Sequence, residues 1–592
     1  MKITAKDSLI SSLIFASLLT LVSVVFPVLG LLTIGVVIGL YLAHCFNIPV
    51  TRGLILAGIL VISYIGAFEF VASIIAPSAP NFTVLHASLI ALATIASKPF
   101  ITSKKQLSRR FVLNSWKEEL VSIALALAAV LLFTIPLVHP HDASVTISFL
   151  SAGEDNASHF AMMNYGIENQ HAPYLAGQTS GLLNALNAYP QGIHSAFAFF
   201  YNSLFGQDSS ANKKLFMYAS AMLFAVFTLT YTIATTCHYL LRKSPYRFIV
   251  AILACTIVSF FLTTVLVTYG FLTQIFAYGL LLTLSVLLQS TTLTKKNRST
   301  FVLASVVLIL GIVFSWYLLA PVAAILVFTT YRKAVFGERS LVSFLYILSA
   351  VLISAGIVAI NTLGRDSGNL TTPGGVYQYE LWVYLLGFAG IGLFAAYRYF
   401  VTHRKMTVFD NLAYSTITLT VLIGTYQLLT VHELRYYYFK SIYLVLILGF
   451  IAGLALLAEL IGKKIKLSTP WITALLILGL GEYLLFAQPG YIRVYLDETY
   501  WQNIEPSMIR GSIQKDQVTT QPDAVFIGDC PVVTKYTLNR WMGAIHLSET
   551  NARAELYAKA FAKPSKFDAL YTAYAKRTEG TAINTVACNT QP

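Results

Sequence analysis

Long apolar runs separated by short charged clusters extend over most of the chain. Fifteen runs are long enough, or almost long enough, to cross a bilayer as helices. They lie near residues 8–28, 29–45, 53–76, 82–97, 119–138, 215–236, 248–267, 272–290, 299–316, 318–330, 341–360, 381–397, 411–430, 441–461 and 469–487. The 318–330 run is short for a full span, so we expect a tilted or re-entrant segment there. The pattern predicts an all-α polytopic transmembrane helical bundle.

The positions of Lys and Arg test this arrangement. If the N-terminus is cytoplasmic, the predicted inner segments hold 24 of the 40 Lys and Arg, and the outer segments before the C-terminal tail hold five. These five are Lys213, Lys214, Arg365, Arg435 and Lys440. Cytoplasmic loops of membrane proteins carry such an excess of cations. We therefore expect a multi-pass protein of the plasma membrane, with its N-terminus in the cytoplasm and its C-terminus outside.

The composition agrees with a membrane protein. The mean hydropathy of the 592 residues is +0.69, and only 11% are charged, against about 25% in soluble proteins. The net charge of +14 does not indicate a nucleic-acid partner, because the cations lie in clusters between apolar runs. No small-residue cleavage site in a polar context follows the first run, so we interpret that run as a span rather than a signal peptide.

Three predicted outer segments are long and polar, whereas the inner loops are short apart from residues 98–118. The outer segments are residues 139–214, 361–380 and 488–592. The outer side therefore has the polar material that a functional site needs.

The last outer segment, 488–592, has the pattern of a small folded domain. Residues 524–527 are strand-like, and helical patterns cover 551–563 and 565–577. We expect a small external α/β domain in which Cys530 and Cys588 form a disulfide bond, because the outer compartment is oxidising.

The most informative polar segment is residues 151–160, Ser-Ala-Gly-Glu-Asp-Asn-Ala-Ser-His-Phe. It places the adjacent acids Glu154 and Asp155 just after an apolar run. His159 follows Asp155 by four residues, so the two side chains share one face of a helix. Such a pair offers a carboxylate base beside an imidazole, or two ligands for a metal ion. The alternative is a solvated helix cap with a surface histidine.

Two further segments place candidate residues on the same side. Tyr189-Pro-Gln-Gly-Ile-His194 precedes an amphipathic stretch that is expected to lie along the membrane, and His194 either faces the acidic site or lies at the interface. Arg435 and Lys440, within 431–440, could hold a phosphate at the lipid–water boundary, or simply anchor the helix end. Smaller signals on this side are Gln274, Trp316 and Tyr437.

Together these motifs resemble the GT-C superfamily of membrane glycosyltransferases, with a layout similar to that of arabinofuranosyl- and mannosyltransferases of bacterial envelopes. Glu154-Asp155 matches the acidic motif of an outer loop, and Arg435 and Lys440 match the basic groups that hold the donor. The resemblance covers about residues 119–487. The acidic loop follows the fifth span rather than the first, which leaves 1–118 as an added module of about four helices.

The resemblance implies transfer of a sugar from a polyprenyl-phosphate donor to an envelope glycan, lipid or protein acceptor on the outer face. Asp155 or Glu154 would be the base, and Arg435 and Lys440 would stabilise the departing lipid phosphate. The sequence establishes no cofactor; a divalent cation such as Mg²⁺ or Mn²⁺, held by Asp155 and His159, is left open.

Three alternatives compete with a transferase. A lipid or polysaccharide transporter would normally carry several ionisable groups within its spans, and here the chief one is Glu69, whose partner the sequence does not identify. An O-antigen-ligase-like enzyme fits the same layout. A scaffold that presents the tail would not need the acidic segment. The chain has no Walker A motif, HExxH or CxxC, which argues against a nucleotide-driven pump.

Overall fold

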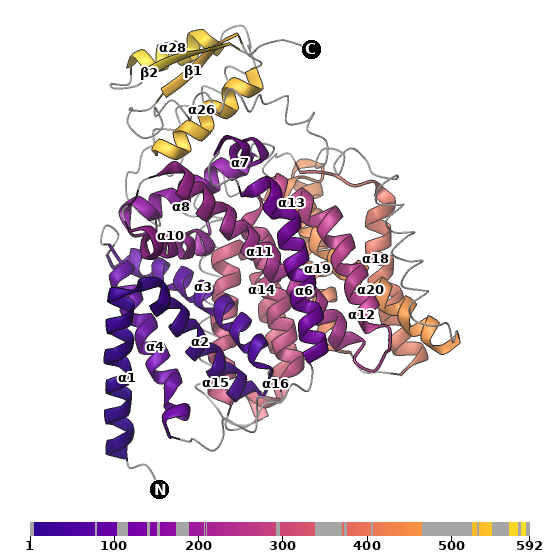
Figure 1. The fold of residues 1–592 in the computed structure, drawn as a ribbon. Coiled ribbons are helices and arrows are strands. Elements are labelled where there is room, and N and C mark those ends of the chain that lie inside the picture. The colour runs from indigo at the N-terminus through magenta and orange to yellow at the C-terminus, as the bar shows by residue number, and fades with distance from the viewer. Residues whose placement is uncertain are drawn as a thin grey trace.

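A computed structural model gives the fold of the chain (Figure 1). It describes residues 5–76, 80–102, 116–138, 143–150, 154–172, 189–206, 208, 210–291, 297–337, 370–371, 376–403, 406–464, 524–529, 532–547, 567–577 and 582–587. All structural statements below concern this part of the chain.

All secondary-structure elements in the first half of the described chain are helices. Its helices are α1 (Ala5–Val25), α2 (Pro27–Phe46), α3 (Val50–Ile75), α4 (Phe82–Thr102), α6 (Trp116–Leu137), α7 (Ala143–Leu150), α8 (Glu154–Asn169), α10 (Gly192–Phe205), α11 (Ala211–Leu240), α12 (Arg247–Ile257), α13 (Thr264–Thr268) and α14 (Leu272–Ser290). A π-helical segment, Val258–Thr263, joins α12 to α13, so the three pieces form one long helix.

The second half adds further helices and one small sheet. Its elements are α15 (Arg298–Trp316), α16 (Ala320–Gly337), α18 (Leu381–Ala396), α19 (Val408–Val431), α20 (Tyr436–Lys464), β1 (Ala524–Asp529), α26 (Val532–His546), α28 (Phe567–Arg577) and β2 (Ala582–Ala587). The strands β1 and β2 pair in parallel, from Ala524 opposite Ala582 to Asp529 opposite Ala587.

Eleven helical segments of the described chain are long and apolar enough to cross a membrane. The prediction of a polytopic helical bundle is therefore confirmed. The apolar runs 341–360 and 469–487 lie outside the described residues.

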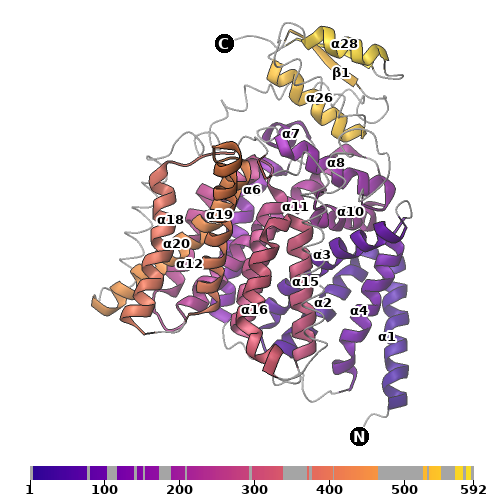
Figure 2. The same cartoon turned by 180° about the vertical axis from the view of Figure 1, so that it is seen from behind.

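The short run 318–330 belongs to a longer helix than its apolar length predicts. A 3₁₀ turn, Tyr317–Leu319, follows the extended Trp316 and separates α15 from α16. Figures 1 and 2 show the two helices side by side. α16 has 18 residues, or about 27 Å at 1.5 Å per residue, because it continues beyond the apolar run to Gly337.

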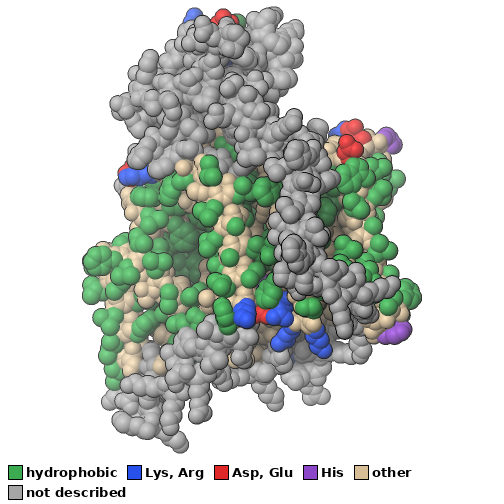
Figure 3. Space-filling model, turned by 45° about the vertical axis from the view of Figure 1, so that its right-hand side comes forward, with side chains coloured by type: hydrophobic (Ala, Val, Ile, Leu, Met, Phe, Trp, Pro, Cys, Tyr) green, Lys and Arg blue, Asp and Glu red, His purple; other side chains and the backbone are tan. Residues whose placement is uncertain are grey.

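Helix ends that the charge pattern assigns to the inner side meet one another. Arg52 at the start of α3 forms an ion pair with Glu119 in the first turn of α6, and Arg247 at the start of α12 lies 2.8 Å from Glu118. Figure 3 shows Lys and Arg gathered at the lower end of the visible face, below a broad apolar surface. The N-terminal end of α1 and the sheet lie at opposite ends of the molecule (Figure 1). This arrangement agrees with the predicted alternation; which end faces outside stays a prediction.

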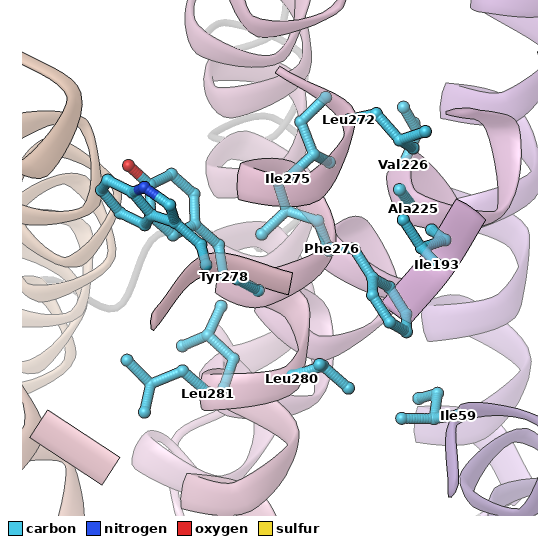
Figure 4. Packing of buried hydrophobic residues seen from close by; sticks show 14 of the residues in the cluster. Ile59, Ile193, Ala225, Val226, Leu272, Ile275, Phe276, Tyr278, Leu280 and Leu281 are labelled. Carbon is cyan, nitrogen blue, oxygen red and sulfur yellow. The ribbon is translucent and has the colours of Figure 1, made fainter. Parts of the chain in front are cut away.

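The centre of the bundle is the packing of α14 against α11 (Figure 4). Phe276 and Ile275 of α14 are fully buried, as are Ala225 and Val226 of α11. Gly279 allows the backbones to approach, since a Cβ there would lie 2.8 Å from the side chain of Thr228. Lipid tails are as apolar as these side chains, so close packing, rather than exclusion from water, holds the helices together.

The C-terminal segment partly matches its predicted elements. β1 confirms the predicted strand, and α28 confirms the predicted helix 565–577, whereas 551–563, Cys530 and Cys588 lie outside the described residues. In the sequence the two cysteines directly follow the last pair of the sheet, Asp529 and Ala587. The disulfide bond and the external position of this segment stay predictions.

Candidate functional site

The two helices that carry the predicted motifs, α8 and α10, pack against each other at the end of the bundle that bears the sheet (Figure 1). α10 rests on α3, where Gly66 faces Gly192 so closely that a Cβ on Gly66 would lie 2.5 Å from the Cα of Gly192. This close approach of two glycines fixes the depth at which α10 lies above α3. The site is therefore built on the main bundle.

Asp155 lies in the first turn of α8, where the helix dipole favours a negative charge. Its Oδ2 accepts a hydrogen bond of 2.7 Å from the hydroxyl of Tyr436 and lies 3.6 Å from the Nζ of Lys440. The Asp155 side chain is 36% exposed, whereas that of Lys440 is only 5% exposed. A buried cation thus lies beneath an accessible carboxylate.

Two aromatic rings contact the ammonium of Lys440, and two side chains bind its backbone carbonyl. Its ammonium lies 3.7 Å from the ring centre of Phe271 and 4.1 Å from that of Tyr436. Its backbone carbonyl accepts hydrogen bonds from Gln274 Nε2 (3.0 Å) and the hydroxyl of Tyr278 (2.6 Å). The ring faces attract the cation, and the carboxylate of Asp155, 3.6 Å from the ammonium, compensates its charge.

His159 and His194 form a stacked pair. Their Nδ1 and Nε2 atoms are 3.0 Å apart, and the rings lie 4.9 Å apart and almost parallel. Burial lowers the pKa of His159 to about 3, assisted by the positive charges of Lys440 and Arg540. Burial and the neighbouring His159 hold the pKa of His194 well below its usual value. Both rings are therefore neutral near pH 7, and one donates its single N–H to the other.

Aromatic and amide residues extend this cluster towards α14 and α15. Tyr189 packs edge-on against His159 at 5.3 Å, and its hydroxyl lies 3.3 Å from that of Thr273. Trp316 packs edge-on against Tyr278, which binds the carbonyl of Lys440. Tyr437 packs edge-on against Tyr436, with ring centres 5.2 Å apart. Gln274 and Trp316 thus connect to the backbone of Lys440, and Tyr437 connects to its ammonium through the ring of Tyr436.

Arg435 is the predicted residue that the structure places elsewhere. Its guanidinium donates to the carbonyl of Thr371 at 2.7 Å and pairs with Glu433 at 2.5 Å. Its contacts are therefore with the 370–371 segment and not with the Asp155 cluster. The side chain of Glu154 lies outside the described part of the chain.

Asn156, in the first turn of α8, is a structural support of the site. It is fully buried, and its Nδ2 donates to the carbonyl of Leu150 at 2.8 Å. Its Oδ1 accepts from the hydroxyl of Tyr218 on α11 at 2.9 Å. Gly270, at φ +83°, allows the backbone before α14 to approach, since a Cβ there would lie 2.6 Å from the amide nitrogen of Asn156. The start of α8 is thereby fixed relative to the bundle.

The C-terminal helix α26 docks onto α8. Asn164 donates from Nδ2 to the carbonyls of Ala544 (3.0 Å) and Ile545 (2.8 Å), near the C-terminal end of α26. The ring of Trp541 lies 5.7 Å from that of Phe160. The amide satisfies carbonyls that a helix end leaves without partners, so this contact is specific.

Arg540 on the same helix reaches the site. It donates to the hydroxyl of Ser158 at 2.9 Å, next to His159. No local pattern points to this residue, because Arg540 and Ser158 are 382 positions apart. Lys440 from α20 and Arg540 from α26 thus both contact the first half of α8.

The predicted metal ligands, Asp155 and His159, have different partners. Asp155 contacts Tyr436 and Lys440, whereas His159 contacts His194. Within the described ranges no group of three or more His, Cys, Asp or Glu residues could hold a metal ion. The structure therefore adds no support to the metal hypothesis.

Glu69 within α3 is fully buried, and its Oε2 accepts a hydrogen bond of 3.1 Å from the amide of Ala172. The partner that the sequence did not identify is therefore a backbone group just after α8. Its other oxygen, Oε1, has no hydrogen-bond partner in the described part of the chain.

Comparisons with protein-family models, with curated proteins and with solved structures found no match to this chain.

Proposed function

We propose that this chain is a membrane glycosyltransferase of GT-C type. It would move a sugar from a polyprenyl-phosphate donor to an envelope glycan, lipid or protein acceptor on the outer face of the plasma membrane. The observation that carries the proposal is the accessible carboxylate of Asp155 beside the buried ammonium of Lys440. A base and a phosphate-binding cation are the two groups that such a transfer needs at one place.

In this mechanism an acceptor hydroxyl attacks the anomeric carbon of the donor sugar. Asp155 takes the proton of the hydroxyl as the new glycosidic bond forms. The bond between the sugar and the phosphate oxygen breaks, and its electron pair goes to the phosphate, whose charge Lys440 stabilises. Direct displacement inverts the anomeric carbon. Because Lys440 is removed from water, its charge acts more strongly than an exposed cation would.

The neutral histidine pair supports binding rather than proton transfer in this proposal. His159 and His194 stay uncharged near pH 7, so they add hydrogen-bonding groups without repelling the cations. With Tyr189 they form a polar and aromatic wall next to Asp155, which suits a sugar ring. Segment 488–592 would be an external domain in this arrangement.

Cells that lack the protein provide the test. We expect lipid-linked sugar intermediates to accumulate, and wild-type protein, but not Asp155→Asn, to reverse the accumulation. Asp208→Asn is the matched control, because Asp208 forms an exposed ion pair with Lys213 outside the Asp155 cluster. Full reversal by the Asp155 variant, or no accumulation at all, would contradict the proposal.

A lipid or polysaccharide transporter is the second candidate. Glu69 is a buried carboxyl within a span, and its Oε1 has no hydrogen-bond partner among the residues that the structure describes. In that case Glu69→Gln should stop movement of the lipid-linked glycan across vesicle membranes, and Asp155→Asn should not. An O-antigen-ligase-like enzyme would also depend on Asp155, but it would use a polysaccharide donor. Activity assays with each isolated donor distinguish this enzyme from the proposed transferase.

A further inference from the structure

A cavity lies between α1, α4 and α10, away from Asp155 and Lys440. Its volume is about 400 Å³, within the range of 300–1,000 Å³ that is typical of ligand sites. Figures 1 and 2 show α1 and α4 side by side at one edge of the bundle, with α10 above their upper ends. On α1, Val24 lines the cavity, and Leu21 and Val24 are 59% and 73% exposed. The cavity therefore lies beside a surface that faces lipid.

Three residues that line this cavity each have one buried polar atom without a hydrogen-bond partner in the described part of the chain: Asn202 Oδ1, His86 Nε2 and Ser23 Oγ. The amide of Asn202 is fixed, because its Nδ2 donates to the carbonyls of Ile167 (3.1 Å) and Ala198 (3.2 Å). Its remaining group is therefore an acceptor that needs a donor. Buried polar groups are almost always hydrogen-bonded in native proteins.

The position of the His86 ring is also fixed. It packs edge-on against Phe199 of α10, with ring centres 5.9 Å apart. Phe82 packs on the same Phe199 ring at 5.6 Å. These rings form apolar walls beside the polar atoms, which is the arrangement that an amphipathic molecule requires.

We infer that this cavity binds the uncharged, hydroxyl-bearing headgroup of a membrane lipid, such as the glycerol end of a diacylglycerol. The single hydroxyl of a diacylglycerol donates to Asn202 Oδ1, and its oxygen can accept from the His86 Nε2–H and from the Ser23 hydroxyl. The described residues that line the cavity include no Lys, Arg, Asp or Glu, so nothing there compensates a phosphate. The acyl chains would lie along the walls and leave between α1 and α4. This inference does not depend on the proposed transferase activity.

Native mass spectrometry of the purified full-length protein with dioctanoylglycerol measures this binding and tests the inference. We expect it to bind more tightly than dioctanoylphosphatidylcholine, whose headgroup carries a phosphate and no hydroxyl. Ala87→Phe should weaken its binding at least tenfold, because Ala87 lines the cavity from an exposed position on α4, where the larger ring fills space without disturbing the core. Ala128→Phe is the matched control, since Ala128 is exposed on α6 outside the cavity.

His86→Phe separates recognition of the hydroxyl from general apolar binding. It keeps a ring against Phe199 and removes Nε2. The expected result is about fivefold weaker binding of dioctanoylglycerol, the effect of one neutral hydrogen bond, with no change for the phospholipid. Equal binding of the two lipids by the wild type, or equal losses in Ala87→Phe and Ala128→Phe, would overturn the inference.

Discussion

Replacing Asp155 by Asn should lower stability as well as activity, because the structure places the buried Lys440 beneath it. The two groups are 3.6 Å apart, with side chains 36% and 5% exposed. Breaking a fully buried pair costs about 3–5 kcal/mol. Since Asp155 is partly solvated and Lys440 keeps its contacts with two aromatic rings, we expect a loss of about 1–3 kcal/mol.

A double-mutant cycle of Asp155→Asn and Lys440→Met separates the two effects. The single Asn variant leaves an unpaired buried cation, and the double variant removes that cation. The double variant should therefore be more stable than the sum of the single losses predicts, by about 1–3 kcal/mol, measured by unfolding in detergent. Its sugar transfer should stay about 10²–10⁴-fold below wild type, because no base is present.

Two results would refute this reasoning. Recovery of transfer in the double variant would mean that Asp155 only neutralises Lys440. A wild-type rate in Asp155→Asn would exclude the carboxylate as the base. Asp208→Asn controls for loss of an acid as such, because its exposed ion pair with Lys213 contributes about 0–1 kcal/mol.

Three further predictions concern the surroundings of the site. Arg435→Ala should weaken binding of a polyprenyl-phosphate donor less than Lys440→Met does, because the guanidinium of Arg435 contacts Thr371 and Glu433. The reverse order in a donor titration would contradict this. The pKa of His159 is about 3 in the fold and about 6.5 when unfolded, so the unfolded chain binds more protons between these values. The free energy of unfolding should fall as pH drops below about 6.5, by up to about 1.4 kcal/mol per pH unit, and His159→Gln should reduce this slope in thermal melts; an unchanged slope would exclude His159. Asn164→Ala should expose the C-terminal segment to trypsin, whereas Asn169→Ala, which removes a bond within α8, should not; equal cleavage would show that Asn164 does not hold α26.

The spans were predictable because apolar length is a local property of the sequence. The run 248–267 corresponds closely to the observed span Arg247–Thr268. The run 318–330 was less informative, since the helix that contains it continues through polar residues to Gly337. Hydropathy locates the part of a helix inside the bilayer, but not where its hydrogen bonding ends.

The first residue of α20 decides which of the two predicted phosphate-binding cations, Arg435 or Lys440, lies at the site. α20 begins at Tyr436, so Tyr436 and Lys440 are four residues apart on one helix face and both reach Asp155. Arg435 precedes the helix and faces Thr371. The sequence placed all these residues on the outer side, but it did not fix the first residue of the helix.

Spacing within one helix also left the partner of His159 open. The four-residue separation from Asp155 indicated a shared face, and the structure instead pairs His159 with His194 on α10. That contact depends on how two helices cross, which no local pattern determines. Arg540 was missed for the same reason, since its approach to Ser158 requires the docking of α26 on α8.

Helices α8 and α10 explain why residues 1–118, 119–487 and 488–592, which the sequence analysis treats as separate segments, meet at one site. α8 and α10 have 16 and 14 residues, so tertiary contacts must supply most of their stability. The N-terminal segment holds α10 through α3, at the contact of Gly66 with Gly192. The C-terminal segment holds α8 from the other side, through Asn164. Residues 1–118 and 488–592 therefore both position the helices that carry Asp155 and the histidine pair.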